Sequence, residues 1–314
     1  MSSDKKTPLI SVVSPVYLAE KMVDELVRRI ASEVLKITDH YEIILVEDGS
    51  PDQSWQKIEE NCAKNKNVVG IKLSRNFGQH YAISAGLAQS KGDYVVLMDC
   101  DLQDPPEEII NLFNKAKEGF DIVLGKRNER KDGYFKKLFG KLFYSLLGFL
   151  TGTKTESSIG AFRIMSRTVV DNFCSMKEYN RFFGGMIGWL GFKTAYVSFQ
   201  HGERASGKTS YNFNKLINLA INAAVSFSDK PLRLAIRFGF GLTLLSVFYI
   251  FYLVLMNIIF GTSAVGWTSL IASVFFSTGL IITLLGVIGL YIGKIFEEVK
   301  RRPLYVIEKI IENK

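Results

Sequence analysis

Cysteine is scarce in this chain of 314 residues. The three cysteines, Cys62, Cys100 and Cys174, are odd in number and lack the spacing of a metal site. This pattern argues against a disulfide framework and indicates reduced thiols in the cytosol. The polar segment Met1–Pro8 is followed only by a short apolar run that Pro15 interrupts, so we expect no signal peptide.

Charged residues are absent between Arg237 and Lys294. This interval holds two apolar runs, Phe238–Phe260 and Trp267–Gly293, which a short polar link at 261–266 joins. A helix of about 20 residues crosses a hydrocarbon core, at roughly 1.5 Å per residue. We therefore expect two transmembrane helices, because no other part of the chain is apolar enough to cover a buried helical hairpin.

Basic residues flank both apolar runs, whereas the link between them carries none. Lys230, Arg233 and Arg237 precede the first run, and Lys294 and Lys300–Arg302 follow the second. The positive-inside rule then predicts a multi-pass membrane protein with both termini in the cytoplasm and the link outside. The predicted organisation is a cytoplasmic domain at 1–230, the two helices at 231–293 and a cytoplasmic tail at 294–314.

The formal net charge of +8 raises the question of a nucleic-acid partner. The basic residues, however, lie beside aromatic ones near the apolar runs, as in Tyr134–Phe143. Such a pattern is typical of an interfacial helix on an anionic leaflet. No zinc or helix-turn-helix signature is present, so we expect a membrane partner and no nucleic acid.

The first 125 residues alternate apolar runs with amphipathic segments, which favours an α/β fold with a mostly parallel sheet. Strands are predicted at Leu9–Ser14, Tyr41–Val46, Val68–Leu73, Tyr94–Met98 and Asp121–Leu124. Helices are predicted at Glu20–Leu35, Ser54–Lys64, Ala82–Gln89 and Pro106–Lys117. Polar clusters follow several strands, and these ends meet at one edge of such a sheet, where a nucleotide would bind.

Beyond Gly125 the pattern is looser. A short strand at Ala161–Met165 and an alternating edge strand at Lys193–Phe199 are predicted. The predicted helices are Tyr134–Leu150, Thr168–Met176, Arg181–Leu190 and Phe213–Ser226.

An acidic cluster, Asp99–Asp104, directly follows the apolar run Tyr94–Met98. Two carboxylates at i and i+2, with the Gln103 amide two residues further on, offer oxygen ligands for Mg²⁺ or Mn²⁺. Such ions complete their shell with substrate phosphates. On this motif alone, a strand end with solvated turn acids is the more frequent interpretation.

The acidic cluster is one of six motifs that occur in a fixed order along the chain: Ser14–Tyr17, Val46–Asp52, Arg75–His80, Gly92–Pro106, Arg204–Tyr211 and Lys300–Tyr305. With the two apolar runs, this set resembles the family 2 inverting glycosyltransferases that make polyprenyl-phosphate sugars. That group includes undecaprenyl-phosphate glucosyltransferases, undecaprenyl-phosphate aminoarabinose transferases and dolichyl-phosphate mannose synthase. The resemblance covers essentially the whole chain. It implies a GT-A (Rossmann-like) domain followed by a two-helix transmembrane hairpin.

For the nucleotide-sugar donor, the resemblance implies that Pro15 and Tyr17 flank the base, with Glu20 as the nearest acid. Asp48 would accept a hydrogen bond from the base or ribose, and Arg75 would help hold the donor. A plain turn at Asp48 and a surface arginine at position 75 are the alternatives.

For catalysis, the resemblance implies that Asp99 and Asp101 act at the donor. Asp99 would face the ribose and the metal, while Asp101 and Gln103 would coordinate Mg²⁺ or Mn²⁺ on the donor diphosphate. A bound divalent cation neutralises the charge that develops on the leaving nucleotide diphosphate.

The acceptor side requires cations, since a polyprenyl phosphate is anionic. Arginine suits this role because its planar guanidinium binds phosphate with two hydrogen bonds. The candidates for the acceptor phosphate are Arg127, Arg130, Arg163, Arg204 and Lys208, and a solvated surface charge is the alternative for each.

The chain departs from the family pattern at three places. Ala161 stands where the family has Asp in Gly-Asp-Phe-Arg, Thr209–Tyr211 replaces Ser-Lys-Tyr, and Leu18-Ala19 replaces Asn-Glu. Loss of the carboxylate at 161 need not abolish transfer. A phosphate monoester has a second pKa of about 6, so at neutral pH most of it needs no deprotonation.

The resemblance implies transfer of one sugar from a nucleotide sugar to undecaprenyl phosphate, with UDP favoured as the nucleotide and GDP left open. It leaves open which sugar is used and which metal is bound. It also suggests a homo-oligomer, with a tetramer as one form. Two alternatives follow. A processive polysaccharide synthase is disfavoured, because the Gln-x-x-Arg-Trp motif is missing, and a catalytically silent membrane scaffold is motivated by Ala161.

Overall fold

The computed structural model describes residues 7–127, 159–200, 230–260 and 266–312. The chain divides into two compact units. One contains the sheet and the C-terminal residues from Arg302 onward, and the other contains the two long apolar helices. The predicted helices Tyr134–Leu150 and Phe213–Ser226 lie outside the described residues.

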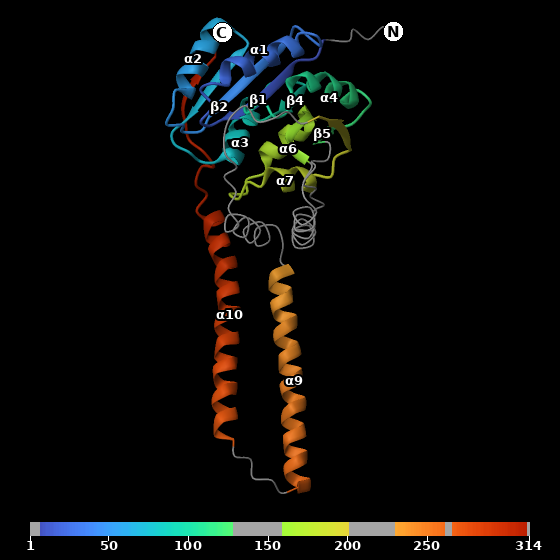
Figure 1. The fold of residues 1–314 in the computed structure, drawn as a ribbon, viewed down its shortest axis with the longest axis vertical. Helices are drawn as coiled ribbons and strands as arrows, with labels where there is room; N and C mark the ends of the chain where they lie inside the picture. Colours follow the sequence, from blue (N-terminus) through green and yellow to red (C-terminus); the bar gives the residue numbers. More distant parts are fainter. Residues whose placement is uncertain (1–6, 128–158, 201–229, 261–265, 313–314) are drawn as a thin grey trace. The chain divides into compact units, whose positions relative to one another are not determined.

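The described residues form one sheet of eight strands in the order β7-β5-β6-β4-β1-β2-β3-β8 (Figure 1). Parallel pairs join β1 to β2 and β4, β2 to β3, and β5 to β7. Strand β6 runs antiparallel between β4 and β5, and β8 runs antiparallel to β3. The sheet is therefore mixed but mostly parallel, as predicted. Its strands are β1 (Ile10–Val16), β2 (Tyr41–Glu47), β3 (Val68–Leu73), β4 (Tyr94–Leu97), β5 (Ile122–Arg127), β6 (Ile159–Ser166), β7 (Thr194–Phe199) and β8 (Ile307–Ile311).

Helices connect the parallel strands and agree with the predicted segments to within a few residues. Helix α3 begins at Gln79, earlier than predicted, because Gly78 adopts a positive φ of 107° that turns the chain into the helix. The segment after Pro105 opens with a 3₁₀ turn, η1 (Pro106–Glu108), before helix α4. The helices of this unit are α1 (Val23–Val34), α2 (Ser54–Lys64), α3 (Gln79–Gln89), α4 (Ile109–Ala116), α6 (Arg167–Ser175) and α7 (Phe183–Trp189).

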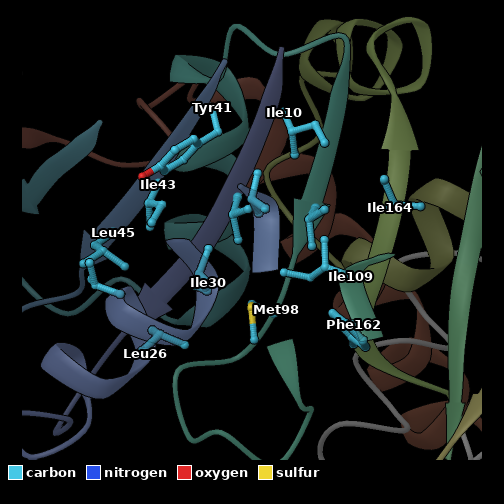
Figure 2. Close-up of a cluster of buried hydrophobic side chains, with 14 of the residues drawn as sticks. Ile10, Leu26, Ile30, Tyr41, Ile43, Leu45, Met98, Ile109, Phe162 and Ile164 are labelled. Atoms are coloured by element: carbon cyan, nitrogen blue, oxygen red, sulfur yellow. The ribbon is translucent and has the colours of Figure 1, made fainter. Parts of the chain in front are cut away.

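The hydrophobic core lies between the sheet and the helices that cover it (Figure 2). Leu26 and Ile30 are one turn apart on α1, and both are fully buried against the strands. Strand β2 is buried on both faces, which explains its continuous apolar run Ile43–Val46. This core holds the carboxyl ends of the parallel strands in fixed positions.

Strand β8 was not predicted. The sequence analysis treated residues 294–314 as a tail, whereas Ile307–Ile311 pairs with β3 at the edge of the sheet. The segment Ile-Glu-Lys-Ile-Ile is short, and its partner strand lies more than 200 residues earlier in the chain. Local pattern alone could not connect the two.

The helical unit contains α9 (Lys230–Phe260) and α10 (Trp267–Val299). Both are long and apolar enough to cross a membrane by length and composition, over Leu232–Met256 and Ser273–Val299. Each helix extends beyond its predicted apolar run at the end where the flanking charged residues lie. Lys294 and Glu297 form such a continuation as an i,i+3 ion pair of 3.0 Å.

Candidate active site

A cleft of about 350 Å³ opens at the carboxyl ends of the parallel strands β1 to β4. The end of β1 and the segments that follow β2, β3 and β4 contribute residues to it, as expected for a ligand site in an open α/β sheet. The polar clusters that follow the strands in the sequence therefore meet in one place. The lining residues are Pro15, Val16, Tyr17, Asp48, Asn76, Gly78, Gln79, Asp99, Cys100 and Asp101.

Asp48 follows β2 and is almost completely buried. Its two carboxylate oxygens accept hydrogen bonds from the backbone N–H groups of Phe77 and Gly78, each at 2.8 Å. Burial raises the pKa of Asp48, while these hydrogen bonds and the charge of Arg75 act in the opposite direction. Asp48 thus holds the loop after β3 against the cleft. Each oxygen keeps a second lone pair, and its predicted bond to a base or ribose stays a prediction.

The loop after β3 is pressed against Gly49, the residue after Asp48. A Cβ atom on Gly49 would lie 2.3 Å from the backbone nitrogen of Asn76, and Gly49 has a φ of +66°. Only glycine combines this close approach with this conformation. Arg75 is exposed, and its guanidinium lies 4.1 Å from the centre of the Phe77 ring.

Asp99 and Asp101 follow β4 and line the same cleft. The pKa of Asp99 is raised to about 6, first by burial and then by the negative charges of Asp104 and Asp101. The Gln79 side-chain amide donates a hydrogen bond of 2.7 Å to Asp99 and opposes the shift, as does Arg127. The Asp99 carboxylate is thus shielded from water and lies near two other negative charges. A bound cation would stabilise its ionised form.

A tight bend carries Asp101 and Gln103. Leu102 has a positive φ of 56°, and the Asp101 carboxylate accepts a hydrogen bond of 3.1 Å from the Gln103 backbone N–H. Gln103 is buried and is not among the residues that line the cleft. Its predicted role as a metal ligand stays a prediction.

The oxygen atoms available in the cleft suit a metal ion that the protein coordinates only in part. Among the described residues, no group of three or more His, Cys, Asp or Glu side chains is arranged to hold a metal. Asp99 and Asp101 nevertheless reach one cleft together. Mg²⁺ is commonly bound by one or two carboxylates, and substrate phosphates and water fill the remaining positions of its coordination shell.

Three other predicted residues lie in or near the cleft. Pro15 and Tyr17 line it, and Tyr17 is 46% exposed. Glu20 is not among the lining residues, because its carboxylate accepts a hydrogen bond of 3.1 Å from the Gln53 backbone N–H. Glu20 thus ties the loop after β1 to the loop after β2, and its donor contact stays a prediction.

Two of the predicted acceptor-side cations lie among the described residues. Arg127 forms a bidentate ion pair with the fully buried Asp104, through two hydrogen bonds of 3.2 Å. Arg163 is buried, and it donates hydrogen bonds to the carbonyl oxygens of Gly160 and Ala161 at 2.8 and 2.9 Å. Burial lowers the pKa of Arg163 to about 10, and the charge of Asp99 opposes that shift. Arg130, Arg204 and Lys208 lie outside the described residues.

The sequence analysis did not assign a role to Gln79, Asn76 or Gly78, although all three line the cleft. Gln79 makes a direct contact with Asp99. The available signal was position, since Arg75–His80 follows a predicted strand in the same way as the acidic clusters do. Cys100 also lines the cleft, and burial raises the pKa of its thiol to about 12, so it is protonated and unreactive.

Comparison with known proteins gives consistent matches. The model of the family described as glycosyl transferase family 2 matches residues 11–173. An uncharacterized glycosyltransferase, YkcC of Bacillus subtilis (strain 168), is 38% identical over 97% of this chain and 95% of its own length. The prophage bactoprenol glucosyl transferase homolog of Escherichia coli (strain K12) is 37% identical, covering 96% of this chain and 99% of its own.

A third relative is the undecaprenyl-phosphate 4-deoxy-4-formamido-L-arabinose transferase of Pseudomonas fluorescens (strain SBW25). It is 35% identical over 97% of this chain and 90% of its own length. Among solved structures, the mannosyl-3-phosphoglycerate synthase of Rubrobacter xylanophilus matches with a TM-score of 0.51 and 20% identity. That match covers 73% of this chain and 75% of the synthase, and it supports the fold.

Proposed function

Since this chain belongs to glycosyl transferase family 2 and is a glycosyltransferase, we propose that it transfers one sugar to a polyprenyl phosphate. The proposed donor is a nucleotide sugar, with UDP favoured, and the proposed acceptor is undecaprenyl phosphate at the cytoplasmic face of a membrane. The observation that carries the proposal is the convergence of Asp48, Asp99 and Asp101 in one cleft. The relatives named for transfer to bactoprenol or undecaprenyl phosphate support the acceptor.

The donor half of the reaction is assigned to the cleft. Pro15 and Tyr17 line the cleft beside the position proposed for the base, and Asp48 follows the neighbouring strand β2 and would accept a hydrogen bond from the base or ribose. Asp99 and Asp101 face the position proposed for the donor diphosphate. Arg75 is exposed beside this cleft and would approach the donor phosphates from the loop after β3.

A divalent cation, Mg²⁺ or Mn²⁺, would be held by Asp99 and Asp101, with Gln103 as a further candidate. When bound, it neutralises negative charge on the leaving nucleotide diphosphate. The Gln79 amide orients the Asp99 carboxylate through its hydrogen bond. The solved structure of a Pyrobaculum calidifontis mannosyltransferase, described as a complex with GDP-Man and Mn²⁺, is similar in fold at 14% identity and a TM-score of 0.50.

The acceptor half requires cations and no strong base. The nucleophile is a phosphate oxygen, which is largely ionised at neutral pH, so inversion at the anomeric carbon proceeds without a carboxylate at position 161. Arg127 and Arg163 are the described candidates for the acceptor phosphate, with Arg130, Arg204 and Lys208 as further candidates. Catalysis then rests on positioning and on charge stabilisation.

Helices α9 and α10 are proposed to anchor the enzyme in the inner membrane with both termini in the cytoplasm. Their length and apolar composition support this, together with the basic residues Arg233, Arg237 and Lys300–Arg302 beside them. A homo-oligomer remains part of the proposal.

The test uses the full-length protein in lipid nanodiscs that contain undecaprenyl phosphate. Radiolabelled UDP-sugars and GDP-sugars are added one at a time with Mn²⁺ or Mg²⁺, and label in the organic phase is measured. We expect transfer from a UDP-sugar that EDTA abolishes and that Asp101→Asn lowers by about 100-fold. Glu118→Gln, a change of an exposed carboxylate outside the cleft, is the matched control and should retain wild-type transfer.

The second candidate function is a silent scaffold that binds nucleotide sugars, which the alanine at position 161 motivates. It predicts nucleotide binding without label in the organic phase for any donor. The two functions are distinguished by this one assay.

A further inference from the structure

The C-terminal strand β8 completes the sheet next to the loop that lines the cleft. Strand β8 pairs antiparallel with β3, with Ile310 opposite Ile71 and Lys309 opposite Lys72. The pairing continues beyond the strands, because the Ser74 backbone N–H donates a hydrogen bond of 3.0 Å to the Val306 carbonyl. Ser74 is the first residue after β3, so the tail reaches the beginning of the loop at Ser74–Gly78.

The loop Ser74–Gly78 contacts the tail at one end and lines the cleft at the other. Asn76 and Gly78 line the cleft, and the N–H groups of Phe77 and Gly78 hold the carboxylate of Asp48. On its other side, the loop rests on Gly49 with no space for a side chain. The loop is therefore held on one side by Asp48 and Gly49, which follow β2, and on the other side by Val306 of the tail.

The tail is anchored along its length. Lys309 forms an ion pair of 2.8 Å with Glu59 of α2, and Glu308 forms one of 3.0 Å with Lys72 of β3. Ile311 packs against the hydrophobic core, whereas its neighbour Ile310 is 43% exposed. Figure 1 shows the red segment that contains β8 beside α2. These contacts join residues 306–311 to two elements of the sheet-containing unit.

The beginning of this segment is anchored as well. Tyr305 is half-buried, and burial raises its pKa while the nearby charge of Arg181 opposes the shift. Arg181 is itself buried and donates hydrogen bonds to the carbonyl oxygens of Phe173 and Met176, at the end of α6. The tail thus runs from the vicinity of α6 to α2 and crosses the edge of β3 between them.

We propose that residues 302–312 are a positioning element for the nucleotide, which holds the loop Ser74–Gly78 in its binding conformation through β3. This inference rests on the proposed function for the identity of the ligand. Without the tail, β3 becomes the edge of the sheet, and its unpaired backbone groups face solvent. The loop then loses its contact with Val306 and samples conformations in which Phe77 and Gly78 release Asp48.

The experiment compares two changes on the same strand in the full-length protein. Ile311→Asp places a charge at the packed position of β8, and Ile310→Asp places the same charge at the exposed position. Hydrogen exchange by mass spectrometry reports on the peptide that contains Ser74–Gly78. Titration with UDP and Mn²⁺ gives the dissociation constant. We expect Ile311→Asp to accelerate exchange and to weaken UDP binding by about tenfold each, and Ile310→Asp to match the wild type.

A purely structural role predicts a different result. Loss of folded protein lowers the number of binding sites but leaves the dissociation constant of the remaining protein unchanged. Unchanged exchange at 74–78 and unchanged affinity in Ile311→Asp would therefore overturn the inference. Ile311→Ala, a milder truncation, gives the same comparison if the aspartate variant does not fold. If the wild type itself fails to bind UDP, the proposed function fails, and the exchange measurement still decides whether the tail controls the loop.

Discussion

Substitution of Gly49 by alanine is the sharpest test of how the cleft is built. Gly49 has a φ of +66°, and an added Cβ atom would lie 2.3 Å from the Asn76 nitrogen and 2.5 Å from the Arg75 carbonyl carbon. Both are backbone atoms, so no side chain can rotate away to make room. The loop that holds Asp48 must move instead.

The magnitude has two parts. Alanine in the left-handed region costs about 1–2 kcal/mol. Overpacking that shifts a backbone segment costs typically 1–3 kcal/mol more. We therefore expect Gly49→Ala to lower the free energy of unfolding by about 2–5 kcal/mol, and to weaken nucleotide binding because the cleft loop is displaced.

Gly119 provides a matched control. It also has a positive φ, of 90°, but nothing lies within 4 Å of a Cβ atom added there. Gly119→Ala should show only the conformational cost and normal UDP affinity. Denaturant unfolding and UDP titration of both variants separate the two contributions. Equal destabilisation and equal affinity in the two variants would refute the close approach of the loop to Gly49.

Three further predictions follow from the site and its surroundings. Asp101→Asn should lower sugar transfer by about 100-fold and abolish the Mn²⁺ dependence of UDP binding, measured by titration with and without EDTA; metal-dependent binding at wild-type affinity would contradict this. Asp104→Ala should destabilise the protein by roughly 3 kcal/mol, because it removes the buried partner of Arg127. A double variant with Arg127→Ala should cost less than the sum of the two single changes, and additivity in denaturant unfolding would argue against the pair. Cys62 is fully buried, and burial raises the pKa of its thiol to about 11. Because the thiol is both shielded from the reagent and less ionised, iodoacetamide should alkylate it at least about 100-fold more slowly in the native than in the unfolded protein. The native rate should rise with pH; mass spectrometry that finds equal native and unfolded rates would exclude this burial.

The positions of the strands and the cleft could be predicted because a buried strand requires a continuous run of apolar residues in the sequence. Strands that are covered on both faces must be apolar along their whole length, as in Ile43–Val46. Their polar ends must then lie where the core stops. This reasoning placed Asp48, Asp99 and Asp101 at one edge, the family resemblance added Pro15 and Tyr17, and the structure brings all five into the cleft.

The partners of individual side chains could not be predicted in this way. Glu20 and Arg127 carry charges that suit a phosphate or a sugar, yet Glu20 binds the backbone of Gln53 and Arg127 binds Asp104. Gln79 carries no charge, yet it contacts Asp99 directly. A side chain binds whichever group the packing of distant elements places within about 3 Å, and spacing along the chain does not encode that distance.

The amino-acid sequence by itself determined the alternation of strands and helices, the acidic cluster after β4 and the two apolar helices, because each depends on residues close together in the chain. It also determined the class of the protein, because the order of short motifs along the chain can be read without the fold. Only the tertiary structure decided that β8 closes the sheet beside β3 and that the loop after β3 rests on Gly49. It also decided that burial and neighbouring carboxylates raise the pKa of Asp99. These features arise from segments that meet only when the chain is folded, since hydrogen bonds, close packing and desolvation depend on distance in space and not on separation in sequence.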